Sequence, residues 1–176
     1  MNRRDFLQHA GWLAALTASA ATSPAWAQGD AQKFTLVGFD ESGQRLLRLE
    51  NFLGKVCLIS FFTSSCSLCN HDLKQMREFY LGSQKQKKDF MLIGVNLDEN
   101  RADFDDYRKL VDLSVPKDQS FPMLWRKGSE YVDNFGPIKQ KPTHFVLDKQ
   151  HRLMFKREGS FMPDDWNRVW DKLNGV

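Results

Sequence analysis

Two cysteines separated by two residues, Cys66 and Cys69, are the side chains of this sequence best suited to chemistry. They follow an apolar stretch typical of a strand and begin a stretch with helical spacing. A thiol at a helix start lies at the positive end of the helix dipole, beside N–H groups without helical partners, and both favour the nucleophilic thiolate. A second thiol one turn later can attack the first and release a mixed disulfide. The pair therefore predicts thiol–disulfide exchange.

The same spacing also occurs in structural disulfides and in zinc sites, which need further ligands. Cys57 and His71 are the nearby candidates, but Cys57 falls on the same face of an apolar strand as Ile59 and Phe61. That position favours a small buried core residue over a third redox thiol or a ligand. An odd number of cysteines leaves pairing between molecules open. We expect no metal and no other cofactor.

The spacing of apolar residues predicts an α/β domain in which a central mixed β-sheet is flanked by helices and preceded by an N-terminal β-hairpin. The hairpin is expected from 33–39 and 45–49, and the other strands at 56–63, 90–97, 143–147 and 153–157. Four helices are expected: one over 67–81, one that begins after a cap at Asp98 or Asn100, a short one near 130–135 and one that begins at Pro163.

The first part of the chain, residues 1–27, has the layout of a secretory signal: a basic start, a modest apolar run and a small-x-small triplet that ends at Ala27. Arg3 and Arg4 lie in a segment that resembles a bacterial twin-arginine export motif. The apolar run is too short for a stable membrane span. We expect a signal peptide over 1–27 and one domain over 28–176, exported to the periplasm, or tethered to the membrane if the signal is not cleaved.

The charge of the domain is nearly balanced. The whole chain carries a formal net charge of +3, and loss of Arg3, Arg4 and Asp5 with the signal would leave +2. A balance of this kind gives no electrostatic basis for binding nucleic acid. The length of residues 28–176 is usual for one domain with one core, and we expect a monomer.

Several short motifs follow one another along the predicted domain. They are Gly54-Lys55, Cys66-Ser67-Leu68-Cys69, Ile93-Gly94-Val95-Asn96, Phe121-Pro122, Phe135-Gly136 and Pro142-Thr143-His144-Phe145-Val146-Leu147-Asp148. Their order resembles that of the exported thioredoxin-like proteins of the TlpA and ResA type, within the redoxin or AhpC/TSA-like part of the thioredoxin superfamily. The resemblance covers nearly all of the predicted domain and implies a thioredoxin-like fold.

The resemblance also implies roles for individual residues. Cys66 would be the exposed nucleophile and Cys69 the resolving thiol of a thiol–disulfide oxidoreductase that reduces protein disulfides. Pro142 would form a cis peptide bond beside the disulfide, and with Lys141 and Thr143 it would dock the client protein. A membrane thiol electron donor would then recycle the dithiol, and no cofactor is implied.

Asp72, three residues after Cys69, stands where this family often has an acidic residue. If it is buried, it could move a proton to or from Cys69; the alternative is a solvated carboxylate on the helix surface. Thioredoxin itself has a buried acid six residues before the first cysteine, but Ser60 occupies that position here. Asp72 is then the carboxylate left for this role.

Four positions depart from the common family pattern: Ser65 before the first cysteine, Ser67 and Leu68 between the cysteines, and Lys141 before the proline. These side chains would touch the sulfur atoms or the docking groove. A change of about 30 mV in reduction potential is only ~1.4 kcal/mol, so the motif does not fix the direction of electron flow. Lys141 could favour the Cys66 thiolate by proximity.

Two other functions fit parts of the pattern. Cys66 and Cys69 with the imidazole of His144 could bind or deliver copper, although copper-handling relatives have three residues between the cysteines. The alternative is that His144 is a strand residue packed or hydrogen-bonded in the sheet. Thr63 and Cys66 echo the Thr-x-x-Cys motif of peroxiredoxins, but Ile59 stands where that motif has a proline. The copper alternative predicts tight binding of one copper ion, and the peroxidase alternative predicts direct turnover of hydrogen peroxide.

Overall fold

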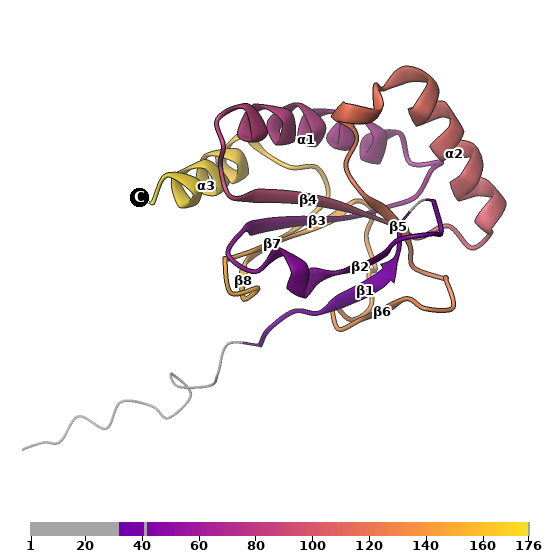
Figure 1. Cartoon of the computed structure of the whole chain (residues 1–176), viewed down its shortest axis with the longest axis horizontal. Coiled ribbons are helices and arrows are strands. Elements are labelled where there is room, and N and C mark those ends of the chain that lie inside the picture. The colour runs from indigo at the N-terminus through magenta and orange to yellow at the C-terminus, as the bar shows by residue number, and fades with distance from the viewer. Residues whose placement is uncertain (1–31, 41, 176) are drawn as a thin grey trace, which may run out of the picture. The chain divides into compact units, whose positions relative to one another are not determined.

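The computed structural model describes residues 32–40 and 42–175, whose arrangement is drawn in Figure 1. The predicted signal peptide, 1–27, lies outside the described residues. The strands are β1 (Leu36–Phe39), β2 (Leu46–Arg48), β3 (Val56–Phe62), β4 (Phe90–Asn96), β5 (Met123–Trp125), β6 (Val132–Asp133), β7 (Thr143–Leu147) and β8 (Leu153–Glu158); the helices are α1 (Ser67–Lys85), α2 (Arg101–Ser114) and α3 (Pro163–Asn174), with 3₁₀ turns η2 (Leu49–Phe52) and η3 (Lys117–Gln119).

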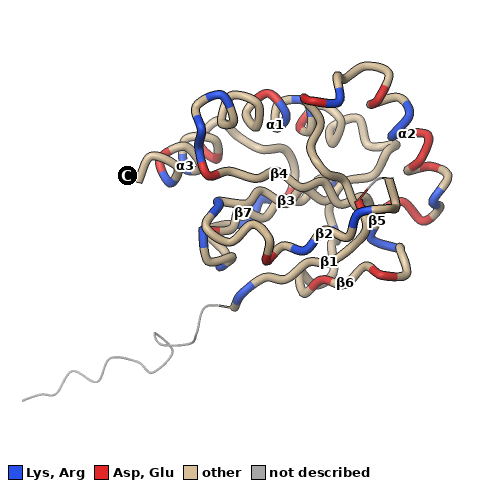
Figure 2. Tube along the Cα trace, viewed as in Figure 1, with Lys and Arg blue, Asp and Glu red and all other residues tan. Residues whose placement is uncertain are grey.

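The central sheet is mixed and has the strand order β5-β4-β3-β7-β8. Strands β3, β4 and β5 run parallel, whereas β7 is antiparallel to β3, and β8 is antiparallel to β7. Every residue of β3 and β4 is buried, and neither strand carries a charged side chain (Figure 2). Continuous apolar strands of this kind are typical of a sheet covered on both faces. The predicted α/β class and the mixed sheet are confirmed.

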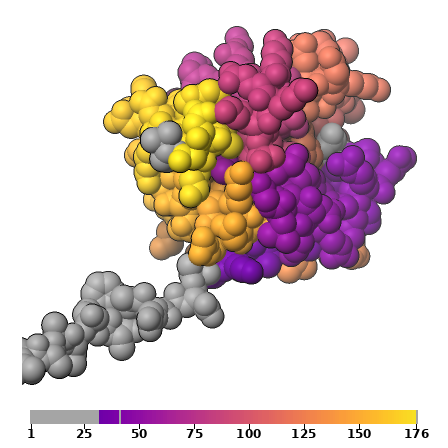
Figure 3. All heavy atoms as spheres, turned by 60° about the vertical axis from the view of Figure 1, so that its left-hand side comes forward, coloured from indigo at the N-terminus to yellow at the C-terminus, as the bar shows by residue number. Residues whose placement is uncertain are grey.

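The helices cover one face of this sheet. Leu73 and Met76 of α1, Phe104 of α2 and Val169 of α3 belong to one buried cluster, together with Leu58 of β3. Side chains alternate along a strand, so the residues on either side of Leu58 point to the opposite face. The end of α1 and the C-terminal helix also lie side by side in Figure 3, where the yellow atoms of α3 adjoin the magenta segment.

A small sheet covers the other face. Strand β1 pairs antiparallel with both β2 and β6, giving the order β2-β1-β6, and the predicted N-terminal hairpin is therefore present. Leu36 and Leu47 from this sheet are buried against Ile59 and Phe61 of β3. The two layers thus bury both faces of β3, the strand that leads into the cysteine pair.

Three local predictions need correction. The helix expected near 130–135 is wrong, because this segment contains β6, whose pairing with β1 overrides the local pattern. Strand β5 was not expected, and it extends the parallel part of the sheet beyond β4. Helix α1 continues past residue 81 to Lys85, where the buried Ser83 donates its hydroxyl proton to the carbonyl of Tyr80. In the described part of the chain, no helix is both long and apolar enough to cross a membrane.

Candidate active site

The two cysteines of the C-x-x-C pair form a disulfide at the start of α1, with an S–S distance of 2.10 Å. The buried strand β3 ends at Phe62, and a short turn places Cys66 at the N-cap of the helix. The Sγ atom of Cys66 accepts a hydrogen bond from the Cys69 backbone N–H at 3.1 Å. Cys66 is partly buried, and Cys69 is fully buried against the sheet. The sulfur nearer to solvent thus belongs to Cys66, and it lies against an N–H group that would also stabilise a thiolate.

Asp98 holds the turn that carries the disulfide. Its carboxylate accepts the Ser64 backbone N–H at 3.2 Å on each oxygen and the side-chain amide of Asn96 at 2.8 Å. Asp98 thus bonds to the turn and to β4, and of the two caps predicted for the next helix, Asp98 or Asn100, it is not the one that the structure uses. Asn100 occupies the N-cap position of α2 but makes no side-chain cap bond there. Asp98 therefore belongs to the support of the disulfide turn, a role the sequence did not indicate.

The loop before β7 passes the end of β3, where Thr143 pairs with Phe61. The Lys141–Pro142 peptide bond is cis. The Thr143 hydroxyl donates to the carbonyl of Gln140 at 2.6 Å, and the carbonyl of Pro142 accepts the Gly159 N–H at 2.8 Å. Lys141 is exposed, and within the described chain its backbone N–H and carbonyl form no hydrogen bond.

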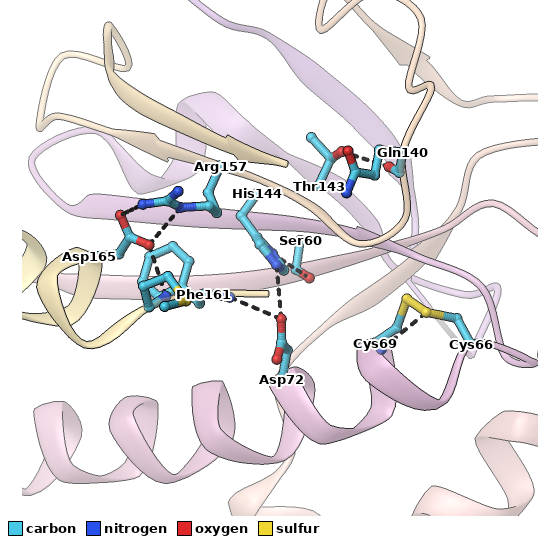
Figure 4. Close-up of polar contacts among 11 residues, drawn as sticks. Ser60, Cys66, Cys69, Asp72, Gln140, Thr143, His144, Arg157, Phe161 and Asp165 are labelled. Carbon is cyan, nitrogen blue, oxygen red and sulfur yellow. Dashed lines mark hydrogen bonds and ion pairs between the residues drawn. A yellow bond between two sulfur atoms is a disulfide. The ribbon is translucent and has the colours of Figure 1, made fainter. Parts of the chain in front are cut away.

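Asp72 is buried on the sheet side of α1 and is 1% exposed, which excludes the alternative of a solvated carboxylate. Its Oδ2 atom lies 3.3 Å from Nε2 of His144 in β7 and accepts the Phe161 backbone N–H at 3.1 Å. The other ring nitrogen of His144, Nδ1, lies 3.1 Å from the Ser60 hydroxyl. Figure 4 shows these groups as a chain of contacts from β3 to α1, with the disulfide one turn away along the helix.

The family model that describes the AhpC/TSA family matches residues 27–156. The chain belongs to the AhpC/TSA family. The match includes the disulfide, Asp72 and Pro142, and the resemblance inferred from the motifs is confirmed.

The chain is similar to the thiol-disulfide oxidoreductase ResA of Geobacillus thermodenitrificans, with 23% identity over 118 residues. That alignment covers 67% of this chain and 63% of ResA, so the chain spans less than two thirds of its relative. Among solved structures, a secreted thiol-disulfide isomerase from Corynebacterium glutamicum has a TM-score of 0.63 at 19% identity, covering 81% of this chain and 84% of that one. A thioredoxin-family thiol:disulfide interchange protein from Chlorobium tepidum has a TM-score of 0.61 at 19% identity, covering 82% and 99%. These likenesses show that this AhpC/TSA protein has the thioredoxin fold.

The third cysteine of this AhpC/TSA protein lies away from the site. Cys57 is 0% exposed and belongs to the cluster on the opposite face of the sheet from Cys69. Its Sγ atom is 3.8 Å from Nε2 of His151. Burial raises the pKa of the Cys57 thiol to about 12, although the nearby charge of Lys55 opposes this shift. Cys57 is therefore an inert core thiol at neutral pH, as its strand position indicates.

The copper alternative is not supported. Both ring nitrogens of His144 face Ser60 and Asp72 in the core, so its imidazole is engaged away from solvent. Among the residues that the structure describes, no three His, Cys, Asp or Glu side chains are grouped so that they could hold a metal ion.

From the sequence, Ser60 marks only the place of a missing acid, and His144 is either a copper ligand or a strand residue packed or hydrogen-bonded in the sheet; the structure confirms the second interpretation of His144 but adds that Ser60 is its partner. A signal for their contact was present, because Ser60 is a polar residue within the apolar stretch 56–62 and His144 one within 143–147. Buried polar side chains need hydrogen-bond partners, which favours pairing of two such residues on neighbouring strands. Nothing comparable in the sequence indicates the contact of the Phe161 N–H with Asp72, because the position of this group depends on how the chain enters α3.

Proposed function

We propose that this protein is a thiol–disulfide oxidoreductase that reduces protein disulfides with the Cys66/Cys69 dithiol. The observation that carries the proposal is the position of the pair: a partly buried Cys66 at the helix N-cap, bonded to a fully buried Cys69. The names of ResA and of the two solved neighbours, each a thiol–disulfide exchange protein, support the same reaction class.

The reaction follows from the two environments. The Cys66 thiolate attacks one sulfur of the client disulfide; a Cys66–client bond forms, the client disulfide breaks, and the first client sulfur leaves as a thiolate. Cys69 then loses its proton and attacks Cys66, which releases the second client sulfur. The protein ends oxidised, with the bond between Cys66 and Cys69, and the client has gained two electrons. A membrane thiol electron donor would return the electrons.

Docking of the client is assigned to Lys141, Pro142 and Thr143. The exposed backbone groups of Lys141, free of internal hydrogen bonds among the described residues, support this assignment because a client strand could pair with them. Leu68, 58% exposed between the cysteines, offers an apolar contact beside the same site. Asp72 is assigned the proton transfer at Cys69, three residues earlier on the buried face of α1.

The proposed place of action is the periplasm, after export by the signal over 1–27, with residues 28–176 acting as a monomeric domain. The secreted Corynebacterium glutamicum neighbour supports an exported location. Replacing both Arg3 and Arg4 by Lys should abolish export if the twin-arginine motif is used. Light scattering of the purified domain would report its oligomeric state.

The decisive test is reduction of insulin by the purified domain with dithiothreitol as the electron source. We expect turnover by the wild-type protein, none by Cys66→Ser, and accumulation of client-linked mixed disulfides with Cys69→Ser. Turnover of hydrogen peroxide without insulin reduction would contradict the proposal. A reduction potential near that of strong oxidants would overturn the reductive direction, even if exchange itself occurs.

A further inference from the structure

The chain of contacts that joins β3, β7 and α1 links three buried polar side chains. Ser60 and His144 are 0% exposed, and Asp72 is 1% exposed. Ser60 and His144 are directly opposite each other in the antiparallel register of β3 and β7, so both point toward α1. Neither His144 nor Ser60 takes part in the thiol reaction proposed above.

The hydrogen-bond directions follow from the chemistry of the groups. A carboxylate oxygen accepts hydrogen bonds, so in this contact Nε2–H of His144 donates to Oδ2 of Asp72. In that imidazole tautomer Nδ1 is an acceptor, and the Ser60 hydroxyl donates a hydrogen bond to it. Ser60 thus selects the imidazole tautomer that donates to Asp72, a positioning effect that a second hydrogen bond commonly exerts on histidine.

Two donors converge on a single carboxylate oxygen of Asp72. The His144 ring and the Phe161 backbone N–H both bond to Oδ2, which leaves Oδ1 as the oxygen able to exchange a proton. A carboxylate in an apolar core is costly unless its oxygens accept hydrogen bonds. The two donors meet this need while they fix the orientation of the carboxylate on the helix face that also carries Cys69.

We propose that His144 is a positioning residue for the thiol reaction: together with Ser60 it holds the Asp72 carboxylate as the proton acceptor for Cys69. This inference rests on the proposed function and assigns one step within it. Asp72 takes the proton from the Cys69 thiol, the Cys69 thiolate attacks Cys66, the Cys66–client bond breaks, and the departing client thiolate receives the proton from Asp72.

Other charged groups near this chain of contacts form ion pairs with one another. Arg157 of β8 is the cross-strand neighbour of His144, and its guanidinium forms two bonds to Asp165 of α3 at 2.7 and 2.9 Å. From α1, the facing titratable groups are Cys69 and Asp72 themselves. On the buried face of α1, the ionisable group without a partner in this network is therefore the thiol of Cys69 once the disulfide is reduced.

The test follows the two steps of exchange separately. Reduced protein is mixed with glutathione disulfide in a stopped-flow instrument: attack by Cys66 depends on the glutathione concentration, whereas release of the second glutathione by Cys69 does not. We expect His144→Asn to slow the release step about tenfold or more and to change its pH profile, without changing the attack step. The deficit should shrink at alkaline pH, where hydroxide in solution removes the thiol proton. Ser60→Ala should act in the same direction and less strongly.

His151→Asn is the matched control, because it replaces the other buried histidine, on the opposite face of the sheet beside Cys57. Its backbone φ of 61° is one that Asn tolerates, so both exchange steps should keep their wild-type rates. A release step with the wild-type rate and pH profile in His144→Asn would overturn the inference but leave the proposed function intact. Absence of both steps in the wild-type protein would instead overturn the proposed function.

A second measurement needs no variant and covers the case in which His144→Asn fails to fold. The ¹⁵N chemical shifts of the His144 ring, recorded at one pH, should change when the wild-type disulfide is reduced, because a proton-exchanging group then faces Asp72. Those of the His151 ring should stay constant. Equal ring shifts for His144 in the two redox states would contradict its coupling to the thiol reaction.

Discussion

At the scale of single residues, burial separates Cys66 from Cys57 by reactivity. Cys66 lies at a helix N-cap with its sulfur near an N–H donor, whereas Cys57 lies within β3, fully buried among apolar side chains. Only a thiolate reacts readily with electrophiles or disulfides. The environment, and not the presence of a sulfur atom, therefore determines which thiol can take part in exchange.

Alkylation should distinguish these thiols. In the reduced, folded protein, iodoacetamide should modify the partly buried Cys66 but leave the fully buried Cys57 unmodified. With its pKa raised by burial to about 12, only roughly one Cys57 thiol in ten thousand would be ionised near pH 8. Mass spectrometry should detect an adduct at Cys57 only after unfolding in guanidinium chloride. Rapid modification of Cys57 in the folded protein would contradict this prediction.

Asp98 should matter for stability because it supplies the acceptor for two donors in a nearly buried turn. Replacement by alanine leaves the Ser64 N–H and the Asn96 amide without that acceptor. We expect Asp98→Ala to lower the free energy of unfolding by about 1–3 kcal/mol, measured by urea denaturation. Asp98→Asn, which keeps one acceptor oxygen, is the control and should lose less. Equal stability of the two variants would show that these bonds are not the cause.

At the scale of elements, helix α3 is anchored to the edge strand β8 by the pair Arg157–Asp165. Asp165 also accepts the Met162 N–H and so caps the start of the helix. Burial of its carboxyl opposes ionisation, but the bonds from Arg157 and Met162 outweigh it and place its pKa below the ordinary value of 3.8. The segment that brings the Phe161 N–H to Asp72 is held at its far end by this pair.

This anchor predicts a dependence of stability on pH. A carboxyl whose pKa is lower in the folded than in the unfolded protein stabilises fully above the unfolded value and loses that effect as the pH falls through the folded value. The thermal midpoint, followed by circular dichroism, should therefore drop below about pH 4, and Asp165→Asn should reduce this slope. Asp164→Asn, at the exposed neighbouring position, should keep it. An unchanged slope in Asp165→Asn would contradict the assignment.

The elements predicted correctly from the sequence are those whose own residues show which face is buried. Strands β3 and β4 are largely apolar runs, and the stripe of Leu73 and Met76 on α1 repeats at helical spacing, so tertiary packing agrees with the local pattern. Strand β6 is different: it has two residues, and its half-exposed segment becomes a strand only because β1 lies beside it. The cysteine pair is predicted by its spacing, which is a local property, whereas the cis bond at Pro142 is implied by the family resemblance.

The network around Asp72 could not be predicted in the same way. Its partners come from β3, β7 and the segment before α3, which are far apart in sequence and meet only in the folded core. A polar residue in an apolar strand indicates that some partner exists, but it does not say which one. The role of Asp98 in the disulfide turn could not be predicted for the same reason, since the nearby helix start offered a local use for its carboxylate as the alternative to Asn100.

At the scale of the whole molecule, the central sheet separates two apolar clusters, one under the helices and one under the small sheet of β1, β2 and β6. Cys69 and Leu73 share the first cluster, whereas Leu47 belongs to the second, on the far side of β3. Stability depends on both clusters, but the geometry of the disulfide is supported from only one of them. A loss of packing in the cluster under the helices should therefore affect the reaction, whereas a loss of packing in the cluster under the small sheet should not.

The matched substitutions Leu47→Ala and Leu73→Ala test this division, since both leucines are almost fully buried, at 2% and 1% exposed. Each should lower the free energy of unfolding by about 2–5 kcal/mol, measured in denaturant, because each leaves a cavity in a packed core. At temperatures where both variants remain folded, insulin reduction by Leu47→Ala should stay near the wild-type rate. Leu73→Ala should change that rate, because its cavity opens in the cluster that holds Cys69. Leu73 is also the residue that follows Asp72 on α1. Equal effects of the two variants on the rate would mean that the two faces of the sheet do not act separately on the disulfide.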